Sequence, residues 1–231
     1  MKLLLTNDDG VDAPGLVALR NAVGKFGEMI SIAPHVPLSG CSHQVTTDRP
    51  LRLVSLPENR YSLDGTSADC VRIALLGITA DVEWVFSGIN DGGNLGVDTF
   101  MSGTVAAARE AALLGKKAVA ISQYRRRQLP FEWEWTAALA EQVLKQLMRR
   151  PLPARCFWNV NLPAEYGELG RIPDIVFCPI DPHPLPVAYE KIDGAFHFRS
   201  IYQNRQKRLG ADVDICFSGR VAVSLVSLDP S

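Results

Sequence analysis

Three short segments of this sequence carry oxygen atoms of the kind that bind metal ions. Two adjacent carboxylates, Asp8 and Asp9, follow the first apolar run of the chain. Ser39 follows the second apolar run, and Asn90 follows a later one. Two neighbouring carboxylates repel each other unless a cation lies beside them. Carboxylate, hydroxyl and amide oxygens together favour a hard divalent cation, Mg²⁺ or Mn²⁺, over zinc.

A fourth segment, made of Ser102, Gly103 and Thr104, lies where a helix is expected to begin. Backbone N–H groups and hydroxyls at a helix N-terminus bind anions such as phosphate. The sequence has neither a Gly-x-x-x-x-Gly-Lys loop nor a catalytic cysteine signature. A metal site beside a phosphate cradle therefore indicates phosphate-ester hydrolysis. Each segment alone could be an ordinary turn or helix cap, so the prediction depends on their lying together.

The elements that must position these segments follow from the apolar pattern of the chain. The runs expected to form parallel strands are 2–6, 28–33, 83–87, 117–122 and 157–161. The helices expected between them begin near Pro14, Thr66, Ser102 and Phe131. This alternation predicts a three-layer α/β fold with a mostly parallel sheet. Because loops leaving the carboxyl ends of parallel strands lie at one edge of a sheet, we expect the four segments to meet there.

The pattern changes after residue 162. Seven prolines lie between Pro163 and Pro230, and the apolar residues alternate with polar ones. The alternating stretches are 175–177, 195–199, 213–217 and 221–225. They predict antiparallel hairpins. We therefore expect a catalytic core over 1–162 and a β-rich extension over 163–231, part of the same domain and used for oligomerisation.

Composition excludes several classes of protein. The chain has 231 residues, 47% of them hydrophobic, and a formal net charge of -1. These values exclude disorder and give no reason to expect nucleic-acid binding. No apolar run reaches membrane-spanning length and no leader is recognisable, so we expect a cytoplasmic protein without membrane contacts. Five scattered cysteines without a Cys-x-x-Cys pair exclude a disulfide framework and a structural zinc site.

Six segments, in order along residues 1–125, resemble the SurE family of survival-protein nucleotidases. They are Leu4–Gly10, Ala13–Gly15, Ala33–Gly40, Gly65–Val71, Ser87–Gly96 and Ser102–Ala107. The segment Asn159–Pro163 extends the similarity. Some positions depart from the family pattern. Ser67 stands where a proline is usual, Met101 where a tyrosine is usual, and Ala211 where a threonine is usual. Ser224-Leu225-Val226 stands where Ser-Ile-Thr is usual.

The resemblance implies a Rossmann-like core with a C-terminal hairpin extension, and a homodimer or homotetramer that exchanges C-terminal segments. It implies a metal-dependent hydrolase that converts nucleoside 5′- and 3′-monophosphates to nucleoside and phosphate, in some members with activity on short polyphosphate. One divalent cation per subunit, Mg²⁺ or Mn²⁺, would be held by Asp8, Asp9, Ser39 and Asn90. Phosphate would be bound by Ser102, Gly103 and Thr104.

Two questions stay open at the level of sequence. Our hypothesis for the reaction is in-line attack by water with Asp9 as general base, and the competing route is direct attack by an aspartate. The alternative functions are a non-catalytic nucleotide-binding protein and a phospho-receiver-like signalling module. Metal-dependent release of phosphate from AMP would separate the enzyme from both alternatives.

Overall fold

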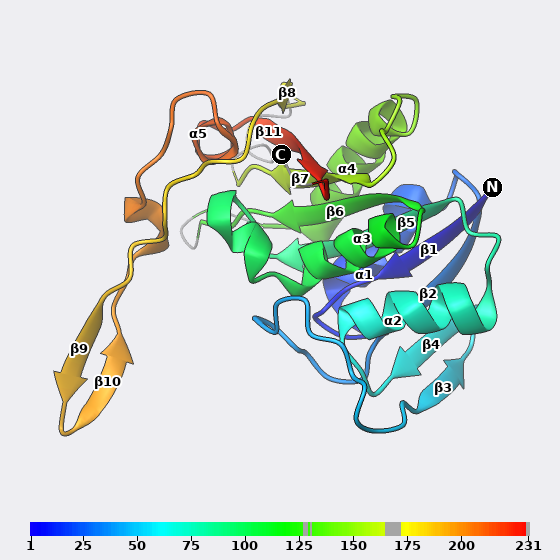
Figure 1. The fold of residues 1–231 in the computed structure, drawn as a ribbon. Coiled ribbons are helices and arrows are strands. Elements are labelled where there is room, and N and C mark those ends of the chain that lie inside the picture. The colour runs from blue at the N-terminus through cyan, green and yellow to red at the C-terminus, as the bar shows by residue number, and fades with distance from the viewer. Residues whose placement is uncertain (127–128, 130, 165–171, 230–231) are drawn as a thin grey trace.

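The computed structural model describes residues 1–126, 129, 131–164 and 172–229 (Figure 1). A nine-stranded sheet forms its centre, in the order β3-β4-β2-β1-β5-β6-β7-β11-β8. Its strands are β1 (Lys2–Thr6), β2 (Glu28–Pro34), β3 (Leu53–Leu56), β4 (Arg60–Leu63), β5 (Trp84–Asp91), β6 (Lys117–Gln123), β7 (Cys156–Leu162), β8 (Ile175–Phe177) and β11 (Val221–Ser227). A separate two-stranded sheet pairs β9 (Tyr189–Ile192) with β10 (Ala195–Phe198).

Six neighbouring strands, from β4 through β7 in the sheet order, run parallel to one another. The helices that connect them are α1 (Pro14–Val23), α2 (Ser67–Ile73), α3 (Gly103–Leu113) and α4 (Trp133–Leu147). Helices α1 and α4 pack together on one face of the sheet, and α2 and α3 on the other. The predicted three-layer α/β fold is therefore confirmed. None of the helices in the described ranges is long and apolar enough to cross a membrane.

Helices α2 and α3 begin at the capping residues that the sequence predicts. Thr66 caps α2 in a capping box: its hydroxyl accepts the N–H of Asp69, whose carboxylate accepts the N–H of Thr66. Ser102 caps α3, because its hydroxyl accepts the N–H of Val105 at 3.1 Å. Alanines on α3 are fully buried, so this helix lies close against the sheet.

Short elements complete the chain. A π-helical turn, η1 (Ala74–Ile78), continues α2, and a 3₁₀ turn, η2 (Gly96–Phe100), precedes α3. In the C-terminal region, η4 (Tyr202–Asn204) and α5 (Asp212–Phe217) lie between β10 and β11. Strand β5 continues past Gly88 to Asp91, whereas the sequence predicts a strand that ends at Ser87. Its pairing with β6 shifts register between Ser87 and Asn90.

The C-terminal region differs from the sequence prediction in one element. The stretch 213–217, expected to be a strand, is helix α5. Alternate apolar residues over only five positions fit one and a half turns of helix as well as a strand. The neighbouring carboxylate of Asp212 accepts the N–H of Val213 at 2.8 Å, which favours the start of a helix.

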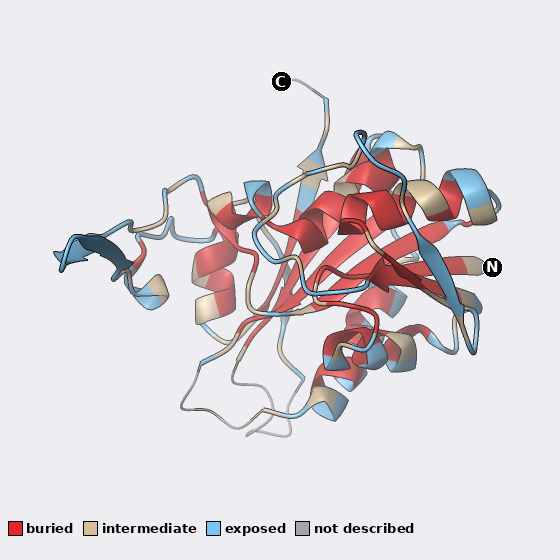
Figure 2. Cartoon of the chain, turned by 90° about the horizontal axis from the view of Figure 1, so that it is seen from below, coloured by how far each residue is buried: buried red, intermediate tan, exposed pale blue. Residues whose placement is uncertain are grey.

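The remaining C-terminal strands have two different roles. Strand β11 pairs antiparallel with β7, and β8 pairs parallel with β11, so both extend the central sheet. Only β9 and β10 form a hairpin that reaches away from the sheet (Figure 1). All eight residues of these two strands are exposed, in contrast to the buried central sheet (Figure 2).

Candidate active site

The loops after β1 and β2 meet at the carboxyl edge of the sheet. The backbone carbonyl of Asp8 accepts the N–H of Leu38 at 2.8 Å. The carbonyl of Pro34 accepts the N–H of Val11 at 3.1 Å. These two bonds fix the acidic pair beside the β2–β3 loop (residues 35–52), which carries Ser39. The side chain of Ser39 itself is exposed.

The N-terminus of α3 contacts Asp8 directly. The hydroxyl of Thr104 donates to Oδ1 of Asp8 at 2.5 Å, and both side chains are buried. A Cβ atom at position 103 would lie 2.8 Å from Cβ and from Oδ2 of Asp8, so only glycine fits there. The structure therefore brings the acidic pair and the expected phosphate cradle together, although they lie about a hundred positions apart in sequence.

The first turn of α3 retains N–H groups that point out of the helix. The hydroxyl of Ser102 accepts the N–H of Val105, so the N–H groups of Gly103 and Thr104 have no partner within the helix. The N–H of Thr104 donates instead to the carboxylate of Asp8 and favours its charged form. The carbonyl of Gly103 accepts the hydroxyl of Ser67 at 2.7 Å, which fixes this turn to α2. The start of α3 is thus held from two sides, and its N–H groups already bind one anion, the carboxylate of Asp8.

The carboxylates of Asp8 and Asp9 lie in an environment that disfavours two negative charges. Burial raises the pKa of Asp8 above its ordinary value. Burial, the charge of Asp8 and the charge of Asp91 raise the pKa of Asp9 to about 6, against the effect of the Asp91 backbone N–H. Asp9 therefore lies between Asp8 and the end of β5. A divalent cation at this position would offset the repulsion.

The end of β5 presents Asn90 at the same edge of the sheet. The side-chain Nδ2 of Asn90 donates to the carbonyl of Gly92 at 2.8 Å. This bond orients the side chain and leaves its Oδ1 as the atom that could bind a cation. Among the described residues, no three His, Cys, Asp or Glu side chains form a metal-binding group. The expected ligand set is consistent with that finding, since it combines two carboxylates with Ser39 and Asn90.

A buried amide network, whose role sequence reasoning missed, supports the loop after β5. The carbonyl of Asn94 accepts the side-chain amides of Asn159 and Asn161 at 2.9 and 3.0 Å. The N–H of Asn94 donates to Oδ1 of Asn161 at 2.8 Å. All three asparagines are buried, so β7 fixes the loop that follows Asn90. Two asparagines at alternate positions of one strand, both on the same side, are the signal that could have indicated this role.

A second cluster, also missed, anchors the β2–β3 loop on α3. The Nε2 atom of His43 lies 2.7 Å from Oε2 of Glu110, and the Nε of Arg72 donates to Oε1 of Glu110 at 2.6 Å. Glu110 is only 2% exposed. Nearby, the N–H of Ser42 donates to the carbonyl of Met101 at 3.0 Å. The imidazole of His43 thus has a structural role.

Replacing Glu110 with Gln is expected to destabilise the protein by about 1–2 kcal/mol, because it removes the charged acceptor shared by His43 and Arg72. The cost stays moderate because the side chain of Arg72 is 39% exposed and keeps contact with water. Burial raises the pKa of Glu110, but hydrogen bonds from His43 and Arg72 outweigh burial and hold it below its ordinary value. The stabilisation is therefore present in full above the unfolded pKa of about 4.3 and is lost as the pH falls through the lower folded value.

Urea unfolding between pH 3 and pH 7 measures this effect. The parent should lose stability toward pH 3 more steeply than the Glu110→Gln variant. The matched control is Glu134→Gln, since Glu134 is exposed on α4. Equal stability of the Glu110→Gln variant and the control at neutral pH would contradict the assigned role of Glu110.

A Rossmann-like sheet whose carboxyl edge carries an acidic pair against a helix N-terminus defines a class of α/β proteins that handle phosphate groups. Within that class, residues 3–179 match the model of the family described as survival protein SurE. The chain belongs to this family, and the predicted resemblance is confirmed.

Individual relatives extend the match to the whole chain. A Nostoc protein with the name "Putative 5′-nucleotidase alr3139" is 50% identical over 227 residues, which cover 97% of this chain and 98% of that protein. The 5′-nucleotidase SurE of Legionella pneumophila strain Philadelphia 1 is 44% identical over 163 residues, covering 71% of this chain and 64% of that protein. The crystal structure of the SurE protein from Aquifex aeolicus superimposes with a TM-score of 0.85 at 29% identity, covering 100% of this chain and 95% of that one.

Proposed function

We propose that this chain is a metal-dependent 5′-nucleotidase that hydrolyses nucleoside 5′-monophosphates, and 3′-monophosphates, to nucleoside and phosphate. The names of its relatives support the class of enzyme. The observation that carries the proposal is the contact of Asp8 with Thr104 and Gly103. The buried carboxylate of Asp8 lies directly against the first turn of α3, and this supports a cation bound next to the phosphate.

The residues at the sheet edge fit a divalent cation. Asp8 is buried and Asp9 is half-buried. The pKa values of both carboxyl groups are raised, so a cation beside them would stabilise their charged forms. The hydroxyl of Ser39 and the carbonyl oxygen of Asn90 complete a set of oxygen donors typical of Mg²⁺ or Mn²⁺. When bound, such a cation would polarise the phosphoryl oxygens and lower the pKa of a water molecule.

The protein groups supply orientation and proton transfer. The N–H groups of Gly103 and Thr104, together with the hydroxyl of Ser102, would hold the phosphate and the charge that develops during the reaction. Asp8 is fixed by Thr104 and serves as a ligand. Asp9 is less buried than Asp8 and is our choice for the general base that accepts a proton from the attacking water.

Chelation with EDTA is expected to abolish release of phosphate from AMP, because both carboxylates then lack the cation that neutralises them. Addition of Mg²⁺ or Mn²⁺ should restore the reaction. The assay should compare 5′- and 3′-monophosphates of several bases, with tripolyphosphate as a further substrate. No phosphate release with Mg²⁺, Mn²⁺ or Co²⁺ would instead favour a nucleotide-binding protein or a phospho-receiver-like module.

The exposed β9–β10 hairpin supports a homodimer or homotetramer. Both strands are exposed along their length (Figure 2). They carry large apolar side chains, including Tyr189, Phe196 and Phe198, which are 61%, 70% and 60% exposed. An isolated two-stranded hairpin is only marginally stable in water, and exposed apolar patches mark interaction surfaces. We propose that this hairpin packs against a second copy of the chain.

The base of the hairpin is fixed to the segment that precedes the phosphate cradle. Arg205, whose side chain is fully buried, donates through Nη1 to Oδ2 of Asp98 at 2.9 Å. The hydroxyl of Tyr202 donates to the same carboxylate oxygen at 2.5 Å. Because Asp98 belongs to η2, assembly through the hairpin would also stabilise the segment that leads to Ser102.

The double change Phe196→Ser and Phe198→Ser is expected to lower the solution mass to that of a monomer, because it removes the apolar surface of the hairpin without touching the central sheet. Light scattering coupled to size-exclusion chromatography measures the mass. Leu76→Ser is the matched control, since Leu76 is 76% exposed on η1, outside the hairpin. An unchanged oligomeric mass of the double variant would refute this role of the hairpin.

A further inference from the structure

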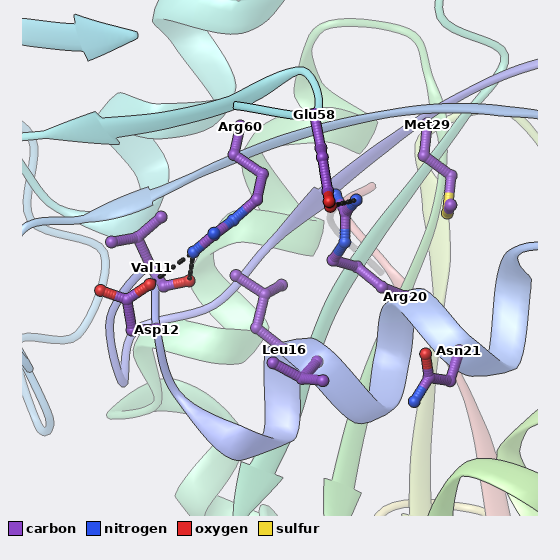
Figure 3. Close-up of a pocket in the computed structure, with 9 residues that line it drawn as sticks. Val11, Asp12, Leu16, Arg20, Asn21, Met29, Glu58 and Arg60 are labelled. Atoms are coloured by element: carbon purple, nitrogen blue, oxygen red, sulfur yellow. Dashed lines mark hydrogen bonds and ion pairs between the residues drawn. The ribbon is translucent and has the colours of Figure 1, made fainter. Parts of the chain in front are cut away.

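A cavity of about 380 Å³ lies between α1 and the start of β4, outside the candidate active site. Figure 3 shows that Arg60 reaches across it from β4 toward Asp12, and that Glu58 reaches across it toward Arg20 of α1. Strands β3 and β4 form one edge of the sheet, beyond β2. The volume lies in the range of small-ligand pockets, which begins at about 300 Å³.

Two guanidinium groups in this cavity are held in place by acceptors inside the protein. The Nη1 of Arg20 donates to the hydroxyl of Ser31 at 2.8 Å, and Ser31 is fully buried. The Nη2 of Arg60 donates to the backbone carbonyl of Val11 at 3.1 Å. Each guanidinium has five N–H donors, so these bonds fix the groups while leaving further donors for a ligand.

The carboxylates that pair with these arginines are held much less firmly. The side chain of Asp12, 2.5 Å from Arg60, is 83% exposed. The side chain of Glu58, 3.4 Å from Arg20, is 76% exposed. Ion pairs at such exposure contribute at most about 1 kcal/mol, so an incoming anion can replace them. The positive charges of the cavity are therefore fixed, and the negative charges can turn out into solvent.

The floor between the two ion pairs is apolar. Leu16 lies between the two pairs and Met29 lies near Arg20, as seen in Figure 3. Leu16 is only 1% exposed, so most of the apolar surface open to a ligand belongs to Met29 and Val17. Asn21 supplies an amide at the same side of the cavity. A ligand that suits this lining has an anionic group for the two arginines and an apolar body for the floor.

We propose that this cavity binds a small organic phosphate, with the phosphate between Arg20 and Arg60 and the organic part on Val17 and Met29. A phosphate is a dianion, so it matches two guanidinium groups better than a single carboxylate does, and arginine binds phosphate through paired N–H donors. The site is formed by residues other than those of the proposed nucleotidase reaction, and it does not depend on that reaction.

Equilibrium dialysis of AMP against the Asp8→Asn variant in EDTA tests the site without turnover. Adding Arg20→Gln and Arg60→Gln is expected to lower the number of AMP molecules bound per chain by one. Inorganic phosphate should compete for this site and adenosine should not. An unchanged number of bound AMP molecules, or competition by adenosine alone, would overturn the proposal. If the proposed nucleotidase function is wrong, the parent protein will not hydrolyse AMP, and this result is independent of the dialysis experiment.

Two further variants distinguish loss of the site from misfolding of the protein. Arg20→Lys with Arg60→Lys keeps both charges but loses the paired donors, so AMP should bind this site about tenfold more weakly. Glu58→Gln removes a carboxylate that competes with the ligand, so AMP should bind about two- to fivefold more tightly, equivalent to at most about 1 kcal/mol. Weaker binding by Glu58→Gln would contradict the arrangement proposed here.

Discussion

The Asp8→Asn variant is expected to lower kcat on AMP by at least about 10³-fold while leaving the fold intact. A bound metal supplies several kcal/mol of transition-state stabilisation, and each 1.36 kcal/mol corresponds to tenfold in rate. Asn keeps an oxygen that can accept the Thr104 hydroxyl, so the packing around position 8 is preserved. The variant loses only the charge that the cation requires.

Steady-state kinetics with AMP and Mn²⁺ measure this loss, and thermal unfolding confirms that the variant is folded. The matched control is Asp48→Asn, because Asp48 is exposed in the β2–β3 loop. The control should retain parental turnover. If the kcat of Asp8→Asn is within tenfold of the parent value, Asp8 is not a ligand of the proposed metal site, whatever the outcome for the control.

The edge at which the site lies could be predicted because polar residues follow buried strands. Asp8 follows an apolar run at 3–5, and Asn90 follows another at 84–86, so a parallel sheet must place both at its carboxyl edge. The contact between Asp8 and Thr104 could not be predicted in the same way. It depends on how closely α3 approaches β1, which is set by tertiary packing and by the absence of a side chain at Gly103.

Other features depend on contacts that leave no local signal. His43 and Glu110 are 67 positions apart, and neither has a spacing that marks it as a partner of the other. The stretch 213–217 was wrongly predicted as a strand because its alternation is too short to distinguish the two periods. Its helical state depends on Asp212, which also accepts the N–H groups of Gly96 and Asp181 from distant loops.

The proposed ligands therefore differ in how directly the structure supports them. Asp8 accepts a hydrogen bond from Thr104 of the phosphate cradle. Asp9 lies close enough to Asp8 and Asp91 for their charges to raise its pKa. Within the described part of the chain, the link between Ser39 and Asp8 is the backbone hydrogen bond from the N–H of its neighbour Leu38 to the carbonyl of Asp8. A substitution at the contact between Asp8 and α3 should consequently affect the site more than a change at the exposed serine.

Gly103→Ala tests that contact with the smallest possible change. The added methyl group would lie 2.8 Å from Cβ and Oδ2 of Asp8, closer than such atoms approach in proteins, so Asp8 or the start of α3 must move. Misplacement of a catalytic group by about 1 Å can cost about 10²-fold in rate, and we expect a loss of that size in kcat/KM. Overpacking costs about 1–3 kcal/mol, but alanine favours helix by up to about 1 kcal/mol relative to glycine.

The expected result is thus a large loss of activity with a stability loss of at most about 2 kcal/mol, because the two effects on folding partly cancel. Kinetics on AMP and urea unfolding separate activity from stability. Gly77→Ala is the matched control, since a Cβ at Gly77 would meet no atom within 4 Å. It should keep parental kcat/KM. A Gly103→Ala variant with kcat/KM within twofold of the parent would show that Asp8 and the start of α3 need not keep this distance, and the proposed coupling of cation and phosphate would fail.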